Sequence, residues 1–305
     1  MSGRPLLYYD IGELGWSMYL AAHLKYLHRT GKTASIIAPE AKRVFYRDCT
    51  QEILPVPEEW ISRFGHYPSD GTHLYNPRTR RRIKDQHLLS EPFRRAYPDY
   101  DIITVYSKFE GERVFEPYHH SRKAEELCGE RLGDTPVILI FPRRRSGKFR
   151  GRNIPRRQWE QIADTLCEVF SDCAVVAVGS AGGAWNNLKV SSSQFIDLVG
   201  WDDTLTLDMM VALCNTKQAI AAVGNQSGTV KITLLCGTPT YIFGHEKERH
   251  TVIENWACTD VDFWEVSPRL GIRPGGDTKA NFSGYRISDL DGMLGEIVSF
   301  ISDVV

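Results

Sequence analysis

The sequence predicts an α/β protein made of two Rossmann-like domains, and three observations predict this fold. The chain has 305 residues, about twice the length of a common domain. Its opening residues read as a strand, a glycine-containing turn and a helix. Its second half alternates short apolar strands with helices of about 10–15 residues, which indicates a parallel sheet covered on both faces.

The first half begins with a βαβ pattern. Apolar residues such as Met18, Leu20 and Leu24 recur near helical spacing, and Gly31 follows the predicted helix. A long stretch rich in Pro, Gly and Arg then predicts loops. The expected elements are a strand at 6–9, a helix at 16–29, a strand at 34–38, loops at 55–98 and a strand at 101–106.

The second half predicts four strands and three helices in alternation, followed by a helical tail. The expected elements are strands at 137–141, 174–179, 218–224 and 239–243, helices at 155–170, 205–215 and 229–236, and a tail helix within 287–305. We therefore expect an N-terminal domain at 1–130 and a C-terminal domain at 131–285. The tail at 286–305 is expected to pack back on the N-terminal domain.

The composition is that of an ordinary folded protein. Apolar residues make up 42% of the chain, charged residues 25%, and the formal net charge is −1, which counts against a general nucleic-acid binder. The first residues lack the apolar stretch of a signal peptide, and no run approaches the roughly 18 apolar residues of a membrane span. We expect a cytoplasmic protein without a transmembrane segment. Seven scattered cysteines predict reduced, mostly buried thiols.

The strongest functional signal is a polar turn between a predicted strand and a predicted helix, within AAVGNQSGTVKITLLCGTPTYIFG at residues 221–244. Such a turn directs unpaired backbone N–H groups and the positive end of a helix dipole at one point, where an anion binds. A glycine lets the backbone approach a phosphate closely, and hydroxyl groups add donors. The turn residues are Asn225, Gln226, Ser227, Gly228 and Thr229. An ordinary turn with Ser or Asn capping is the alternative.

A second signal is the basic loop FPRRRSGKFRGRNIPRRQW, residues 141–159, which lies between a predicted strand and a helix that Pro155 is suited to start. An anionic ligand at the carboxyl edge of the sheet would relieve the repulsion among its charges. The basic residues are Arg143, Arg144, Arg145, Lys148, Arg150 and Arg152. Arg152 is the first candidate for contact with the anion, and a solvated basic loop is the alternative.

These segments resemble the inverting bacterial heptosyltransferases and related GT-B enzymes, which transfer sugars from nucleotide diphosphates. The family has a K-x-W-P-like element followed by an aromatic residue, and RNIPRRQW at 152–159 is similar, with Arg152 in place of a phosphate-binding lysine. The family's D-S/T-G-x-x-H loop, followed by G-T-P and F-G, looks like Gln226 to Lys231, Gly237 to Pro239 and Phe243-Gly244. The resemblance implies two Rossmann-like domains facing each other across a cleft, with the donor on the C-terminal one.

The resemblance also implies roles for individual residues. Expected contacts of the donor diphosphate are Arg144, Lys148, Arg152, Ser227, Gly228, Thr229 and Lys231. Expected contacts of the donor sugar or ribose are Asn225, Gln226, His245 and Glu246. Two positions depart from the family, because Gln226 replaces its acid and Lys231 its histidine. Which residues hold the hydroxyls of the donor sugar is therefore left open. Lys231 either faces the diphosphate or is a solvent-facing helix residue.

The N-terminal half carries a shorter likeness, IGELGW at residues 11–16, where the family has a Gly-Asp element that supplies the catalytic base. Glu13 falls on that acid. A carboxylate there would take the proton from an acceptor hydroxyl, on a saccharide or glycoconjugate, as the oxygen attacks the anomeric carbon. One displacement then inverts the anomeric configuration, and backbone N–H groups with Arg152 meet the charge of the leaving diphosphate. No metal or other cofactor is required.

Other interpretations stay open. Asp99-Tyr100-Asp101 spells the D-x-D pattern by which other glycosyltransferases hold a divalent ion, although acids also mark turns; Asp202-Asp203 is typical of a loop before a helix. A nucleotide-sugar 2-epimerase would share the phosphate loop but need paired acid–base groups. Arg-rich segments at 78–82 and 143–157 suggest a glycosyltransferase for modified nucleic-acid bases. The departures at Gln226 and Lys231 suggest a noncatalytic nucleotide-sugar-binding module.

Overall fold

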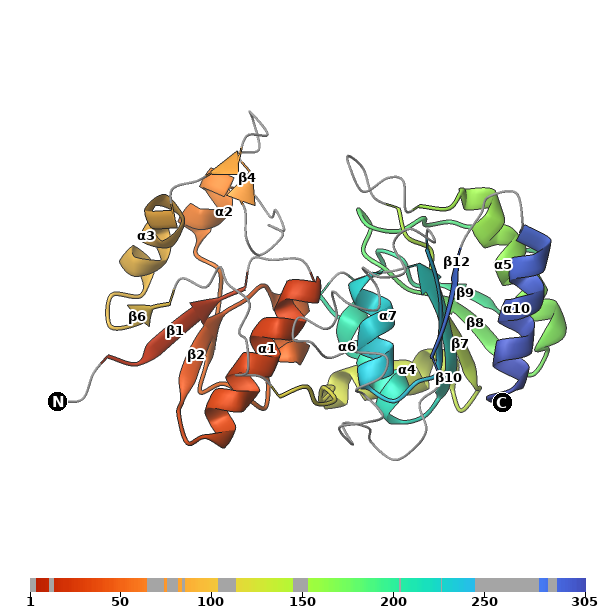
Figure 1. Ribbon diagram of the computed structural model, residues 1–305, viewed down its shortest axis with the longest axis horizontal. Coiled ribbons are helices and arrows are strands. Elements are labelled where there is room, and N and C mark those ends of the chain that lie inside the picture. Colours follow the sequence, from red (N-terminus) through yellow and green to blue (C-terminus); the bar gives the residue numbers. More distant parts are fainter. Residues whose placement is uncertain are drawn as a thin grey trace. The chain divides into compact units, whose positions relative to one another are not determined.

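Two compact units, residues 1–115 and 116–305, make up the computed structural model (Figure 1). The structure describes residues 4–10, 14–64, 74–75, 82–83, 86–103, 114–144, 153–202, 204–225, 227–244, 280–284 and 290–305. The division lies earlier than the predicted boundary at residue 130. The reason is that helix α4 (Arg122–Leu132) packs on helix α6 (Thr206–Asn215) of the C-terminal unit.

The N-terminal unit contains a parallel sheet in the order β3-β2-β1-β6. The predicted βαβ start is confirmed, with small shifts at the element ends. The elements are β1 (Leu6–Tyr9), α1 (Leu14–Arg29), β2 (Ala34–Ile37), a 3-10 helix η1 (Glu40–Phe45), β3 (Ile53–Leu54) and β6 (Asp101–Ile102).

Helices pack on both faces of this sheet. Successive side chains of a strand point to opposite faces. The hydroxyl of Tyr8 lies 3.3 Å from Nε2 of His23 on α1, while the neighbouring Leu7 and Tyr9 belong to a cluster with Trp60 and Phe93. Trp60 and Phe93 stack with their ring centroids 4.6 Å apart.

Residues 55–98 were predicted to be rich in loops, but the described part of this stretch contains two helices and two short strands. Trp60 lies on α2 (Glu58–Phe64) and Phe93 on α3 (Gln86–Ala96), and a short hairpin joins β4 (Leu74–Tyr75) to β5 (Arg82–Ile83). Helix α3 even contains Pro92. Local propensity is a weak guide where burial decides, and Phe93 is fully buried in the core.

The C-terminal unit contains a six-stranded parallel sheet in the order β12-β11-β10-β7-β8-β9. The strands are β7 (Val137–Phe141), β8 (Ala174–Ala177), β9 (Phe195–Asp197), β10 (Ala219–Asn225), β11 (Thr240–Gly244) and β12 (Ala280–Gly284). The remaining helices are α5 (Arg156–Val169), α7 (Gly228–Leu235) and α10 (Leu290–Ser302). The alternation predicted for this half is confirmed.

Helices also cover both faces of this second sheet (Figure 1). Ile138 and Ile140 of β7 pack with Trp159 of α5 and Ile297 of α10 in one cluster, while α4, α6 and α7 lie on the opposite side of the sheet. The tail was expected to pack on the N-terminal domain, and the contacts that the structure describes for it lie within the C-terminal unit. Helix α10 buries its apolar side chains in the C-terminal core, and the hydroxyl of Tyr241 donates to Glu296 at 2.6 Å.

The connection from β8 to β9, residues 178–194, contains no helix. Two carboxylates of α5 hold it instead: Oε1 of Glu160 accepts from the backbone N–H of Lys189, and Oδ1 of Asp164 from that of Ser191, both at 2.9 Å. The bond from the Lys189 N–H is the main cause that lowers the pKa of Glu160. Helix α5 therefore holds the second half of this connection.

Six cysteines within the described residues are free thiols and buried. Burial raises the pKa of Cys128 to about 12. None of the described helices combines the length and apolar content needed to cross a bilayer.

Candidate functional site

The strand order of the C-terminal sheet contains one reversal. From β7 the chain builds β8 and β9 on one side, then returns to place β10 on the other side of β7, followed by β11 and β12. This is the 3-2-1-4-5-6 order of Rossmann sheets, in which ligands bind beyond the carboxyl ends of the strands at the reversal. Phe141 at the end of β7 pairs in register with Gly224 near the end of β10. The loops after these two strands therefore meet at the expected binding edge.

Gly224 brings three segments into close contact at this edge. A Cβ atom there would lie 2.7 Å from Cγ1 of Val230 on α7 and 3.0 Å from Cδ2 of Phe141 on β7. Only a residue without a side chain lets the end of β10 approach both neighbours so closely. The start of α7 is consequently held directly beside the end of β7.

We expect Gly224→Ala to lower the free energy of unfolding by about 1–3 kcal/mol, because the added methyl group overpacks the contact with Val230. Gly295→Ala is the matched control. A Cβ at this position of α10 meets nothing within 4 Å, so that change should stabilise the protein by about 0.5–1 kcal/mol. Urea denaturation of both variants measures the two values. A neutral Gly224→Ala would contradict the close packing of this edge.

The first turn of α7 follows β10, one of the two strands between which the order reverses. Ser227, at the N-cap position, is extended with φ −155° and ψ 170°, and its side chain forms no capping hydrogen bond. Its hydroxyl oxygen lies 2.7 Å from that of Thr229 instead. The alternative of an ordinary turn capped by Ser227 therefore does not hold, and the first amides of the helix are not satisfied by that hydroxyl.

Two further predicted residues are buried at this turn. Asn225, the last residue of β10, is 1% exposed, and Lys231 of α7 is 7% exposed. The interpretation of Lys231 as a solvent-facing helix residue is thus wrong. The structure does not describe Gln226 or residues 245–250, so the predictions for Gln226, His245 and Glu246 lie outside the described residues.

The ends of the basic loop are tied together next to β7. Nη1 of Arg143 donates to Oδ1 of Asn153 at 2.6 Å, which joins the two sides of the loop. The guanidinium carbon of Arg144 lies 4.8 Å from the centroid of the Trp185 ring. Trp185 is a residue that the sequence motifs did not single out, because its aromatic ring belongs to a different loop. Lys148 and Arg152 lie outside the described residues.

In the N-terminal unit, a buried carboxylate marks the end of β1. Asp10 is fully buried and accepts from the hydroxyl of Tyr46 at 2.6 Å and from Nζ of Lys42 at 2.9 Å. Both partners come from the segment that follows β2. No sequence motif singled out this buried acid, although an acid directly after a strand could have indicated it. Glu13 lies outside the described residues.

The acidic pairs considered as metal ligands are differently placed. Asp101 is the first residue of β6, so the D-x-D segment lies at the amino end of a strand parallel to β1, away from the edge at which β1 ends. Asp202 lies before α6. Its carboxylate accepts hydrogen bonds from the hydroxyl and from the backbone N–H of Thr204, and these bonds, that from the hydroxyl most, lower the pKa of Asp202. Within the described residues, no group of three His, Cys, Asp or Glu side chains is arranged to hold a metal ion.

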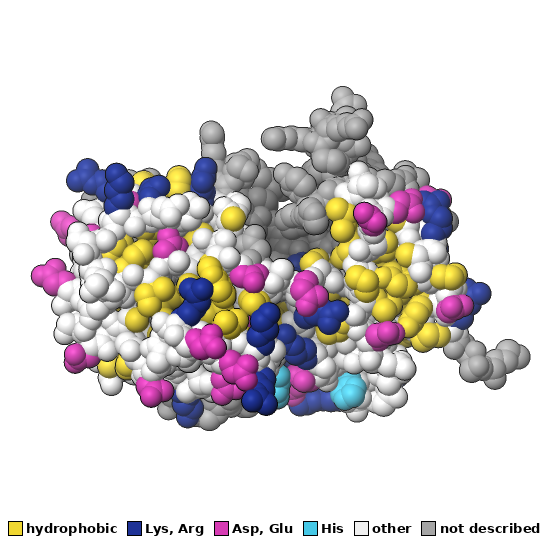
Figure 2. Space-filling model, turned by 180° about the vertical axis from the view of Figure 1, so that it is seen from behind, with side chains coloured by type: hydrophobic (Ala, Val, Ile, Leu, Met, Phe, Trp, Pro, Cys, Tyr) yellow, Lys and Arg dark blue, Asp and Glu magenta, His cyan; other side chains and the backbone are white. Residues whose placement is uncertain are grey.

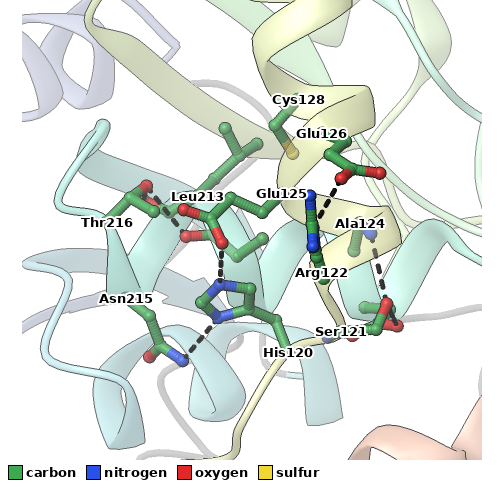
Figure 3. A network of polar contacts seen from close by, with 12 residues as sticks. His120, Ser121, Arg122, Ala124, Glu125, Glu126, Cys128, Leu213, Asn215 and Thr216 are labelled. Atoms are coloured by element: carbon green, nitrogen blue, oxygen red, sulfur yellow. Dashed lines mark hydrogen bonds and ion pairs between the residues drawn. The ribbon is translucent and has the colours of Figure 1, made fainter.

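A separate polar network fixes the start of α4 on α6 (Figure 3). Ser121 donates through its backbone N–H and its hydroxyl to the buried Asp208, at 3.0 and 2.7 Å. Figure 3 shows His120 between Asn215 and Glu125. Nδ1 of His120 lies 3.1 Å from the amide nitrogen of Asn215, and Nε2 lies 3.4 Å from Glu125. These groups are engaged in joining two helices, which gives His120 a structural role.

Charged side chains of both signs lie on the face of the described residues that Figure 2 presents. Acidic and basic side chains are interspersed over this face.

Comparisons with known proteins identify the fold. No protein-family model and no curated protein matches the sequence. The structure is similar to that of ADP-heptose LPS heptosyltransferase II from E. coli, with a TM-score of 0.54 and 15% identity over 98% of this chain and 99% of that one. It is also similar to a glycosyl transferase family 9 structure from Veillonella parvula, with a TM-score of 0.53 and 11% identity over 99% of this chain and 95% of that one. The GT-B fold expected from the sequence resemblance is confirmed.

Proposed function

We propose that the chain is a glycosyltransferase that takes its sugar from a nucleotide diphosphate donor. The observation that carries the proposal is the position of Ser227, Gly228 and Thr229, which start helix α7 at the reversal of a 3-2-1-4-5-6 sheet. The likeness to two glycosyltransferase structures over nearly the whole chain supports it at the level of the fold. Fold alone does not specify chemistry, so the site must carry the argument.

The diphosphate binds at the first turn of α7. The N–H groups of Gly228 and Thr229 and the positive end of the helix dipole stabilise its charge, and the hydroxyls of Ser227 and Thr229 are close enough to donate to neighbouring oxygens. Arg144 and Arg152, from the loop after β7, supply the cations. Negative charge grows on the diphosphate as its bond to the sugar breaks, so donors fixed at this point stabilise the transition state more than the bound donor.

Glu13 serves as the general base on the acceptor side. It takes the proton from a hydroxyl of a saccharide or glycoconjugate while the oxygen attacks the anomeric carbon. The sugar is transferred in one displacement with inversion, and the nucleoside diphosphate leaves. Because arginines and backbone N–H groups stabilise the negative charge of the leaving diphosphate, the reaction requires no divalent metal.

A thermal-shift screen tests the donor. The full chain is melted with ADP, GDP, UDP and CMP and with their sugar conjugates, each with and without magnesium or manganese. A ligand at about 100 times its Kd adds about 2.7 kcal/mol of stability, so one nucleoside diphosphate should raise the melting temperature equally with and without metal. A shift that requires metal would contradict metal independence. No shift with any nucleotide would contradict the proposed donor.

Two arginine variants test the location of the site. Arg152→Ala should weaken binding of the selected diphosphate about tenfold, as expected from the loss of a charge-assisted hydrogen bond. Arg122→Ala is the matched control, because this arginine is 90% exposed on α4 and pairs with Glu126. Its Kd should equal that of the wild type. Equal effects of the two changes would indicate a general loss of positive charge rather than a specific site.

A further inference from the structure

An arginine and a tryptophan from different loops stack beside the proposed donor site. Arg144 follows β7 by three residues, and Trp185 lies in the helix-free connection after β8. Their guanidinium carbon and ring centroid are 4.8 Å apart. Because β7 and β8 are neighbouring parallel strands, both residues lie at the carboxyl edge of the sheet, and β7 is the strand at which the order reverses.

Trp185 is anchored on three sides. Its backbone N–H donates to the carbonyl of Pro142 at 2.7 Å, its indole Nε1 donates to the carbonyl of Ile154 at 3.3 Å, and its ring packs against the core under α5. The two carbonyls belong to the segments on either side of the basic loop. These contacts therefore fix Trp185 relative to both ends of that loop.

The turn before Trp185 is compact and also holds the backbone of Arg144. A Cβ on Gly179 would lie 2.5 Å from Cβ of Ala184, so the chain can fold back on itself only with glycine at that position. The carbonyl of Gly183 accepts from the backbone N–H of Arg144 at 2.8 Å. Backbone and side chain of Arg144 are thus both held by the same turn.

The contact with Trp185 does not use the N–H groups of the Arg144 guanidinium. Arg144 is exposed, and within the described residues it forms no ion pair with a carboxylate. Contact with the face of an aromatic ring fixes the plane of the guanidinium without using its N–H groups. The planar fork of donors that remains matches two oxygens of a phosphate.

We propose that Trp185 is a positioning residue, which holds Arg144 in the orientation that binds the donor diphosphate. The inference rests on the proposed function and assigns one side of the donor site to the β8–β9 connection. Trp185 does not itself touch the diphosphate. Its contribution is to limit the orientations of a long side chain before the ligand arrives.

A double-mutant cycle tests the proposal in the full chain. Isothermal titration with the nucleoside diphosphate selected by the thermal-shift screen gives Kd for each protein. Arg144→Ala should raise Kd about tenfold and Trp185→Leu about three- to fivefold, as expected for a charge-assisted hydrogen bond and for an exposed cation–π contact. Trp185→Phe keeps an aromatic face and should restore Kd to within about twofold of the wild type. The double variant should bind no more weakly than Arg144→Ala alone, because Trp185 acts through Arg144.

The controls separate this inference from general loss of structure and from failure of the proposed function. Titrations are made well below the melting temperature of each variant, and Arg122→Ala should leave Kd unchanged. If the losses of binding free energy in the two single variants add up in the double variant, Trp185 acts independently of Arg144. That result would assign Trp185 a purely structural role and overturn the inference. An unchanged Kd for Arg144→Ala, with a raised Kd for Arg152→Ala, would overturn it while the donor site stands. If the wild type binds no nucleotide, the proposed function fails as well.

Discussion

Asp10→Ala is expected to lower the free energy of unfolding by about 3 kcal/mol. The carboxylate is fully buried and accepts from both Tyr46 and Lys42, so its removal takes a charged acceptor away from a partly buried ammonium and from a buried hydroxyl. Loss of one member of a buried ion pair costs about 3–5 kcal/mol. The lower end applies because the Lys42 side chain is 12% exposed and retains some contact with water.

Two companion changes identify the cause of this loss. Tyr46→Phe removes a single hydrogen bond to the carboxylate and should cost about 1–3 kcal/mol, less than the loss of Asp10 itself. Asp99→Ala replaces an exposed acid of the same unit and should change stability by less than about 0.5 kcal/mol. Urea denaturation of the full chain, with hydrogen exchange to locate the loss in β1 and η1, gives the values. Equal stability of the Asp10 and Asp99 variants would show that the buried pair contributes nothing.

Glu13→Gln is expected to reduce the rate of sugar transfer by about 10²–10⁴-fold, the usual contribution of a general base. The amide is similar in size to the carboxylate but cannot accept the proton of the acceptor hydroxyl. Donor binding should not change, because the diphosphate site proposed above lies in the other unit. Release of nucleoside diphosphate from the selected sugar donor measures the rate, and titration with the same donor measures binding.

Asp10→Asn is the matched control for the Glu13 change. It makes the same acid-to-amide exchange three positions earlier, at a side chain that is occupied by Tyr46 and Lys42. We expect reduced stability but a turnover rate within about threefold of the wild type once corrected for the folded fraction, since Asp10 is not in the proposed proton path. Normal turnover by Glu13→Gln, or its loss only in Asp10→Asn, would exclude Glu13 as the base.

Regular periodicity made much of the fold predictable from the sequence. Helix α5 and strand β7 were expected almost at their observed ends, because each has an uninterrupted apolar pattern with clear boundaries. Helix α3 was not expected, because Pro92 suggests loop locally while Phe93 is buried by contacts with distant residues. Contacts between segments that are distant in the sequence cannot be predicted from the residues of one segment alone.

The candidate site, like the fold, could be predicted from the sequence only in part. The turn at Ser227 was recognisable, since glycine and hydroxyl residues between a strand and a helix have a local physical meaning. The contact between Arg144 and Trp185 joins loops about 40 residues apart and follows only from the pairing of β7 with β8. The burial of Lys231 also could not be read from sequence, because a lysine in a helix usually faces water.

The network between Ser121 and Asp208 determines where the C-terminal half can be separated from the rest of the chain. A fragment that starts at residue 131 lacks nearly all of α4. The carbonyl of Met209 then loses its hydrogen bond from the thiol of Cys128. It also leaves the buried carboxylate of Asp208 without the two donors of Ser121. A fragment that starts at Glu116 keeps this helix and its hydrogen bonds. The C-terminal unit thus begins with a helix that precedes its first strand.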